Sequence, residues 1–123
     1  MKVDYFKFSK FFIYLVPFAI AIMSRSTLFP FIVGKYVWFR TAVDLALIAF
    51  LLGLLFMPRE ANIYENRLKK VLTSPLTISV VLFVFFFLLA GFFGHDPAYS
   101  FWSNFERGEG GLQILHLGIF FLL

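Results

Sequence analysis

The sequence predicts an all-α fold built from several membrane-spanning helices, and its composition and charge pattern both indicate this class. Of the 123 residues, 61% are hydrophobic and 15% are charged, whereas a soluble domain carries about 25% charged residues. The charges lie at the ends of long apolar windows, and a helix needs ~20 apolar residues to cross the hydrocarbon layer. We therefore expect a multi-pass protein with three full transmembrane helices and the start of a fourth.

The first helix is expected at about 6–24. Its uncharged window between Lys10 and Arg25 is short, so a full crossing requires the lysine side chains to extend along the headgroups. A signal peptide is the alternative, because a basic start precedes a short apolar core and the cleavage-like triplet Ala19-Ile20-Ala21. More apolar windows follow, so both interpretations keep the chain in the membrane, and we favour the uncleaved anchor.

The second helix is expected at about 38–57. Tyr and Trp favour the headgroup level, and the aromatic stretch from Phe29 to Phe39 therefore marks one membrane face. Arg40 and Asp44 follow at i and i+4, on one face of the helix.

The third helix is expected at about 75–94, where no charged residue occurs. At 1.5 Å per residue this window is ~30 Å long, which matches the hydrocarbon thickness. Ser74-Pro75 supplies an N-cap and a proline at the first helical position. The polar connector before it predicts a short surface helix around 64–71.

A short interfacial helix is expected at about 97–105, because Asp96-Pro97 repeats the same start signal. A glycine-rich stretch then allows the chain to turn into the fourth window, 111–123. A carboxylate at the end of that window would lie in hydrocarbon at a cost of at least several kcal/mol. We therefore expect residues 1–123 to be the N-terminal transmembrane region of a longer protein.

The Lys and Arg residues favour a cytoplasmic N-terminus, since the cytoplasmic side then holds seven of the eleven. Four basic residues fall on the outer side: Arg25, Lys35, Arg40 and Arg107. Positive charge on the outer side works against this orientation. An anionic ligand in the outer leaflet would hold these basic side chains on that side.

The densest polar cluster runs from Phe101 to Gly110. In a functional interpretation Trp102 stacks on a sugar and Arg107 forms paired hydrogen bonds with phosphate oxygens. In the alternative interpretation the segment is an interfacial anchor, with Glu106 and Arg107 solvated. Residue types alone favour the anchor.

Two further polar groups lie in the apolar windows. Arg40 with Asp44 either orients the guanidinium toward an outer-leaflet phosphate or neutralises itself at a helix end, and both interpretations stay open. For His116, a hydrogen bond to a neighbouring helix is favoured over a role as proton acceptor.

Several function classes receive no support. There is no cysteine, and His95 and Asp96 are adjacent rather than at metal-ligand spacing, so we expect no metal and no cofactor. D-x-D and the phosphate-binding G-x-x-x-x-G-K-[ST] pattern are both absent. The net charge of +4 comes from basic residues beside apolar windows, which does not indicate nucleic acid.

Two stretches resemble the N-terminal region of the bacterial O-antigen ligase and O-antigen polymerase family. The first is Phe29-Pro30-Phe31-Ile32-Val33-Gly34-Lys35 continuing to Arg40 and Asp44. The second, which is more specific, is Gly94-His95-Asp96-Pro97 followed by Ser100-Phe101-Trp102-Ser103-Asn104-Phe105-Glu106-Arg107-Gly108-Glu109-Gly110.

The resemblance implies an integral-membrane glycosyltransferase of the bacterial inner membrane. Such enzymes ligate or polymerise polyprenyl-diphosphate-linked glycan on the outer membrane face. Arg107, Arg40 and Lys35 would contact the diphosphate, Trp102 would stack on sugar, and Glu106 or Glu109 would orient Arg107 or a sugar hydroxyl. The family's best-known catalytic elements would lie beyond Leu123. A transporter or flippase subunit is the alternative.

Overall fold

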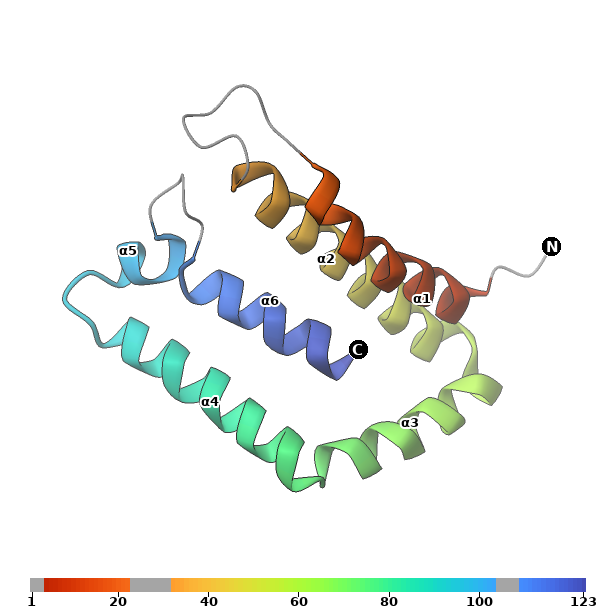
Figure 1. Ribbon diagram of the computed structural model, residues 1–123. Coiled ribbons are helices and arrows are strands. Elements are labelled where there is room, and N and C mark those ends of the chain that lie inside the picture. The colour runs from red at the N-terminus through yellow and green to blue at the C-terminus, as the bar shows by residue number, and fades with distance from the viewer. Residues whose placement is uncertain (1–3, 23–31, 104–108) are drawn as a thin grey trace.

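The computed structural model describes residues 4–22, 32–103 and 109–123, and all regular structure in them is helical. Figure 1 shows a helical hairpin at the N-terminus, a connecting helix, and a second hairpin that returns beside the first. The elements are α1 (Tyr5–Leu15), η1 (Val16–Ala21), α2 (Val33–Phe56), α3 (Pro58–Leu72), α4 (Pro75–Phe92), α5 (Pro97–Trp102) and α6 (Gly111–Leu122).

The first hairpin is closely packed because α2 presents small residues to α1. Ala42, Ala46, Ala49 and Gly53 are all buried, and small residues let two helix backbones approach each other. The Ser9 hydroxyl donates across the contact to the Ala46 carbonyl oxygen, at 2.8 Å. A hydrogen bond between the helices thus accompanies the close packing.

The first predicted helix is not one continuous α-helix. Residues Val16–Ala21 form a 3-10 helix, because Pro17 has no N–H to donate and its ring clashes with the carbonyl of residue 13 in an α-helix. A 3-10 helix rises ~2.0 Å per residue instead of ~1.5 Å. Together α1 and η1 therefore extend over about 28 Å, more than an α-helix of equal residue number would.

The second predicted helix starts earlier than expected. α2 begins at Val33 rather than near 38, so Tyr36 and Trp38 lie within its first turns. The Trp38 indole N–H donates to the Leu15 carbonyl oxygen at 2.9 Å. Packing against the first hairpin helix therefore extends α2 through the aromatic stretch.

α3 is about twice as long as the surface helix expected at 64–71. Pro58 begins it, Glu60 lies in its first turn, and Lys69 and Lys70 lie in its last turn, an arrangement that favours the helix dipole at both ends. The Tyr64 ring stacks on Phe6 with centroids 4.1 Å apart. α3 runs across the ends of α2 and α4 (Figure 1).

The second hairpin consists of α4, α5 and α6. Ser74 accepts the Thr77 backbone N–H at the start of α4, and Asp96 accepts the Tyr99 N–H at the start of α5. Both predicted N-caps are therefore present. α4 ends at Phe92 rather than 94, and α5 ends at Trp102 rather than 105.

α6 lies between α2 and α4 (Figure 1). A Cβ added at Gly118 of α6 would lie 3.0 Å from Val84 of α4. The glycine therefore permits the close approach of these two helices.

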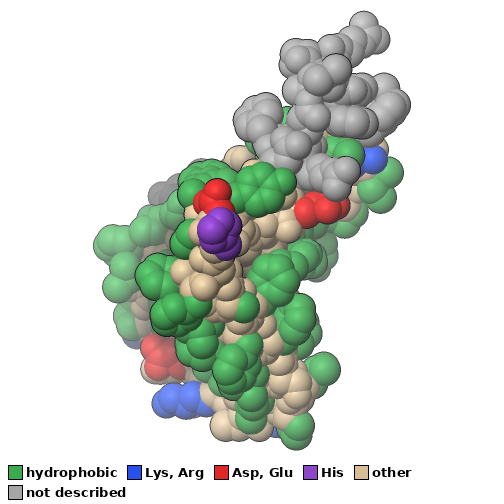
Figure 2. Space-filling model, turned by 90° about the vertical axis from the view of Figure 1, so that its left-hand side faces the viewer, with side chains coloured by type: hydrophobic (Ala, Val, Ile, Leu, Met, Phe, Trp, Pro, Cys, Tyr) green, Lys and Arg blue, Asp and Glu red, His purple; other side chains and the backbone are tan. Residues whose placement is uncertain are grey.

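Apolar side chains are widely exposed. On α4, four residues are exposed by more than half of their area: Leu76, Phe83, Phe85 and Phe86. Figure 2, which views the molecule from the left-hand side of Figure 1, shows hydrophobic side chains across that face. Within the described residues, α2 and α4 are the helices long and apolar enough to cross a membrane. The expectation of three full membrane-spanning helices is therefore not confirmed.

Candidate functional site

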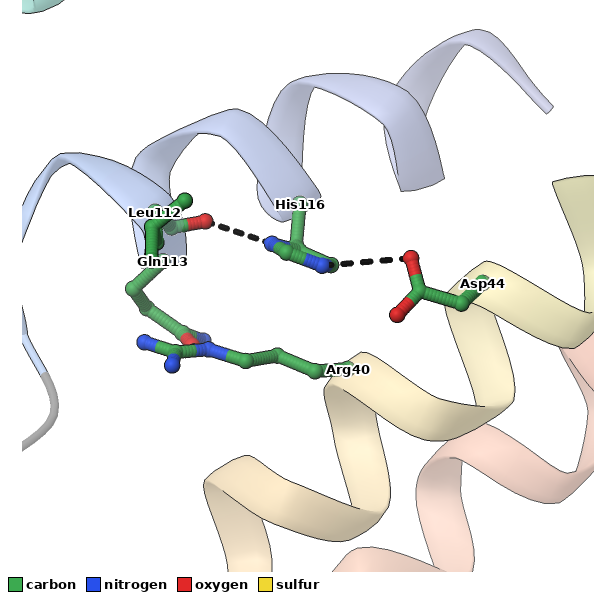
Figure 3. Close-up of polar contacts among 5 residues, drawn as sticks. All are labelled: Arg40, Asp44, Leu112, Gln113 and His116. Atoms are coloured by element: carbon green, nitrogen blue, oxygen red, sulfur yellow. Dashed lines mark hydrogen bonds and ion pairs between the residues drawn. The ribbon is translucent and has the colours of Figure 1, made fainter.

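Four polar side chains connect α2 and α6 in two layers. Arg40 and Asp44 are one turn apart on α2, and Gln113 and His116 are about one turn apart on α6. Figure 3 shows that Arg40 meets Gln113 while Asp44 meets His116. We call these four residues the α2–α6 polar bridge.

The first layer holds the Arg40 guanidinium. Its Nε–H donates to Gln113 Oε1 at 3.1 Å, and its Cζ lies 4.8 Å from the centre of the Tyr36 ring. A guanidinium over an aromatic face is attracted to the ring's electron density. The Arg40 side chain is therefore held from two directions.

The second layer is centred on the His116 ring. Nε2 lies 3.2 Å from Asp44 Oδ1, and the His116 side chain is 13% exposed while that of Asp44 is 53% exposed. Nδ1 lies 2.6 Å from the Leu112 carbonyl oxygen, one turn earlier in α6. Both ring nitrogens thus face oxygen atoms, which agrees with the favoured interpretation that His116 bonds to a neighbouring helix.

The remaining candidates are not all described. Arg107 and Glu106 lie outside the described residues, as does the Phe29-Pro30-Phe31 start of the first family-like stretch. Lys35 is half-buried in the first turn of α2, whereas Trp102 at the end of α5 is 66% exposed. The structure brings Arg40, but not the whole predicted set, into a defined polar contact.

Glu109 is exposed and lies four positions before Gln113. The next residue, Gly110, packs closely on α5, since an added Cβ there would lie 2.2 Å from the Phe101 carbonyl oxygen. Glu109 therefore lies beside the start of α6, the helix that carries Gln113.

Gln113 was not among the predicted site residues. Its signal in the sequence is its spacing from His116: two polar residues at i and i+3 share one face of an otherwise apolar helix. Arg40 and Asp44 show the same kind of spacing on α2. The spacing thus marks a polar face on each helix, although it does not show that these two faces meet.

An apolar groove of about 250 Å³ lies between α4 and α6, on the opposite side of α6 from the bridge. Its lining residues include Val84, Phe85, Leu88, Leu115 and Leu122. The side chains that line the groove are all apolar. Among residues 4–22, 32–103 and 109–123, no group of three His, Cys, Asp or Glu side chains is placed to hold a metal ion.

Comparison with protein-family models, curated proteins and solved structures finds no match to this chain. The class that the fold itself defines is an all-helical protein with two apolar helices of membrane-crossing length in its described part.

Proposed function

We propose that the chain is part of an integral-membrane glycosyltransferase that ligates or polymerises polyprenyl-diphosphate-linked glycan on the outer face of the bacterial inner membrane. The family resemblance suggests this activity. The position of Arg40 in the polar bridge is the observation on which the proposal for this chain depends.

The apolar surface of α4 supports membrane insertion. A helix in the core of a soluble protein is mostly buried, whereas 6% of the most apolar window of α4 is buried. Exposing such a surface to water would be unfavourable by ~25 cal/mol for each Å² of apolar area. α1 and η1, at about 28 Å together, would supply a further crossing beside α2.

The arrangement of polar segments supports a two-sided protein. α3, with exposed Arg59, Arg67, Lys69 and Lys70, lies at one end of α4, while α5 lies at the other (Figure 1). In the proposed orientation α3 is cytoplasmic, as the excess of positive charge on that side requires. The bridge residue Arg40 is then near the outer face, where the lipid-linked substrate is presented.

In the proposed reaction an acceptor hydroxyl attacks the anomeric carbon of the glycan. The new glycosidic C–O bond forms as the bond to the polyprenyl diphosphate breaks, and the hydroxyl proton is released. Negative charge develops on the leaving diphosphate, and a preorganised cation stabilises it strongly in a partly dry site.

Arg40 suits this role because its side chain is fixed before substrate arrives. Gln113 accepts from Nε–H, and the Tyr36 ring lies against the guanidinium, with 4.8 Å between Cζ and the ring centre. A guanidinium recognises phosphate through paired hydrogen bonds, which a lysine ammonium cannot reproduce. The apolar α4–α6 groove offers a surface for the prenyl chain.

Binding is the direct test. The protein in lipid nanodiscs would be titrated with a polyprenyl diphosphate, a polyprenyl monophosphate and the free prenyl alcohol. We expect the diphosphate to bind most tightly and Arg40→Lys to weaken it about ten- to a hundred-fold, the value of a hydrogen bond to a charged group. Arg59→Lys, on α3 at the opposite end, is the matched control and should bind as the parent does.

Transfer is tested separately in cells, by restoring surface glycan in a strain that lacks the gene. The flippase alternative would be favoured by two results together: the protein binds diphosphate without transferring glycan, and in vesicles it moves the lipid-linked glycan across the bilayer. Equal binding of all three lipids would exclude a diphosphate site at Arg40.

A further inference from the structure

The surroundings of His116 determine how many protons it shares with Asp44. The Leu112 carbonyl oxygen, 2.6 Å from Nδ1, can only accept a hydrogen bond, so Nδ1 must be the donor. Asp44 Oδ1 lies 3.2 Å from Nε2 on the other side of the ring. An ionised carboxylate also only accepts, so this second contact needs a proton of its own.

We infer that Asp44 and His116 form a proton-binding site within the α2–α6 contact. The pair holds one proton more than a neutral imidazole beside an ionised carboxylate. That proton is either on Nε2, which makes an imidazolium–aspartate ion pair, or on Asp44, which then donates to Nε2. Both forms join the helices by one N–H···O or O–H···N bond and leave the pair with no net charge.

Removing this proton has a definite structural consequence. With the Leu112 contact in place, the Nε2 lone pair would face a carboxylate oxygen, and the interaction between α2 and α6 would become repulsive. The bridge would then keep only its Arg40–Gln113 layer. The proton is therefore a ligand that fastens α6 to α2, and this inference does not depend on the proposed glycosyltransferase activity.

Within residues 4–22, 32–103 and 109–123, few other titratable groups surround the pair. On α2 the neighbours on the same face are Arg40, one turn away, and Tyr36. α6 has no titratable residue besides His116, and α4, which packs against α6, has none. α5 contributes Tyr99, while α1 packs against the small-residue face of α2. Among the described residues, Arg40 is thus the charged side chain that lies nearest to the pair along α2.

The protonation state can be measured directly, because the chain has two histidines. The protein would be labelled with ¹⁵N-histidine in lipid bilayers, and His95→Gln would assign the His116 signals. At pH 7 we expect both His116 ring nitrogens to be protonated, or Nδ1 alone together with a carboxylic-acid infrared band that Asp44→Asn removes. The Nε2–H tautomer, or a neutral ring beside an ionised Asp44, would overturn the inference.

Asp44→Asn provides the matched comparison. The asparagine amide can donate to an unprotonated Nε2, so the helices stay joined while the site holds one proton fewer. We expect His116 to be the neutral Nδ1–H tautomer in this variant whichever form the parent adopts, with the His95 signals unchanged. A His116 ring that carries both protons in Asp44→Asn would contradict proton sharing with Asp44, and the parent spectrum remains decisive if the variant fails to fold.

Discussion

The Trp38 indole N–H of α2 donates to the carbonyl oxygen of Leu15, 2.9 Å away, at the residue where the first helix changes from α to 3-10 geometry. Carbonyl groups at the end of an α-helix lack partners within the helix. Leu15 is also the N-cap of the 3-10 segment, and Trp38 supplies its carbonyl oxygen with a donor from the neighbouring helix. A single side chain thus stabilises the change of helix type that Pro17 imposes.

This contact predicts the effect of Trp38→Phe. The ring is largely retained but the donor is lost, so the free energy of unfolding should fall by about 1 kcal/mol. Thermal unfolding in detergent micelles would measure the change. Trp102→Phe is the control, because Trp102 is 66% exposed at the end of α5 and should unfold at the parental temperature. Equal effects of the two substitutions would contradict the role of the Leu15 contact.

Gly110→Ala should disrupt the junction between α5 and α6. The added Cβ would lie 2.2 Å from the Phe101 carbonyl oxygen and 2.9 Å from the Ser103 nitrogen, and backbone atoms cannot move aside as a flexible side chain can. We expect a loss of at least the 1–3 kcal/mol typical of overpacking, measured by thermal unfolding.

The matched control for that substitution is Gly91→Ala. At Gly91 the nearest atom to an added Cβ is Ser100 Cβ at 3.5 Å, an ordinary van der Waals contact. Gly91 also lies in the last part of α4, where alanine favours the helix. Gly91→Ala should therefore be neutral or stabilising, and a similar loss at both glycines would show that the tight contact at Gly110 is not the cause.

Much of this fold follows from local signals in the sequence. The caps at Ser74 and Asp96 and the uncharged window after Pro75 predict where α4 and α5 begin. The 3-10 segment was missed because Pro17 was treated as part of an apolar window, although its missing N–H prevents a continuous α-helix. α3 is longer than expected for two reasons. Pro58 can begin a helix, and the Phe6–Tyr64 stack supports the helix through a tertiary contact that the local sequence does not show.

The site was predicted less completely than the helices. Arg40 and Asp44 were recognised as one face of a helix, but their partners lie on α6, with Gln113 73 positions after Arg40. Spacing within one helix cannot show which neighbour that helix meets. Arg107 and Glu106 stay predictions, since they fall outside the part of the chain that the structure describes.

The N-terminus of α1 should respond to acid. The Lys7 backbone N–H donates to Asp4 Oδ1 at 3.1 Å, and this bond, with the nearby Lys7 ammonium, lowers the pKa of the Asp4 carboxyl below its ordinary value of 3.8. Because the folded pKa is the lower one, the stabilisation is complete above about 3.8 and is lost as the pH falls through the folded pKa.

The Lys7 amide shift in NMR spectra, followed from pH 6 to pH 2, would report this loss. Asp4→Asn keeps an oxygen that can cap the helix but cannot titrate, so its Lys7 amide should show no transition below pH 4. The same Lys7 amide transition in Asp4→Asn would show that the transition does not come from the Asp4 carboxyl.

The proposed orientation can be tested with single cysteines, because the chain contains none. Asn66 of α3 and His95 after α4 are both exposed, and they lie on segments at opposite ends of α4 (Figure 1). In intact cells Asn66→Cys should resist a membrane-impermeant thiol reagent, while His95→Cys should react. The reverse labelling pattern would put α3 outside and remove the basis for an outer-leaflet substrate near Arg40.

The last prediction concerns Gln113, which holds Arg40 without being proposed to contact substrate. If the glycosyltransferase proposal is right, Gln113→Leu should lower transfer about ten-fold or more, since the lost bond is to a charged donor. Gln113→Glu keeps an acceptor and adds an opposite charge, so it should retain most of the Arg40 positioning.

The two variants separate positioning from bulk packing when glycan transfer is measured over a range of lipid-linked substrate concentrations. A fixed guanidinium that acts mainly in the transition state predicts a lower kcat in Gln113→Leu with little change in KM. Gln113→Glu should restore kcat, although leucine and glutamate are similar in size. A rise in KM alone would mean that Arg40 binds the substrate equally in its ground and transition states. Equal activity of the parent, Gln113→Leu and Gln113→Glu would show that the Gln113 contact does not position Arg40 for transfer.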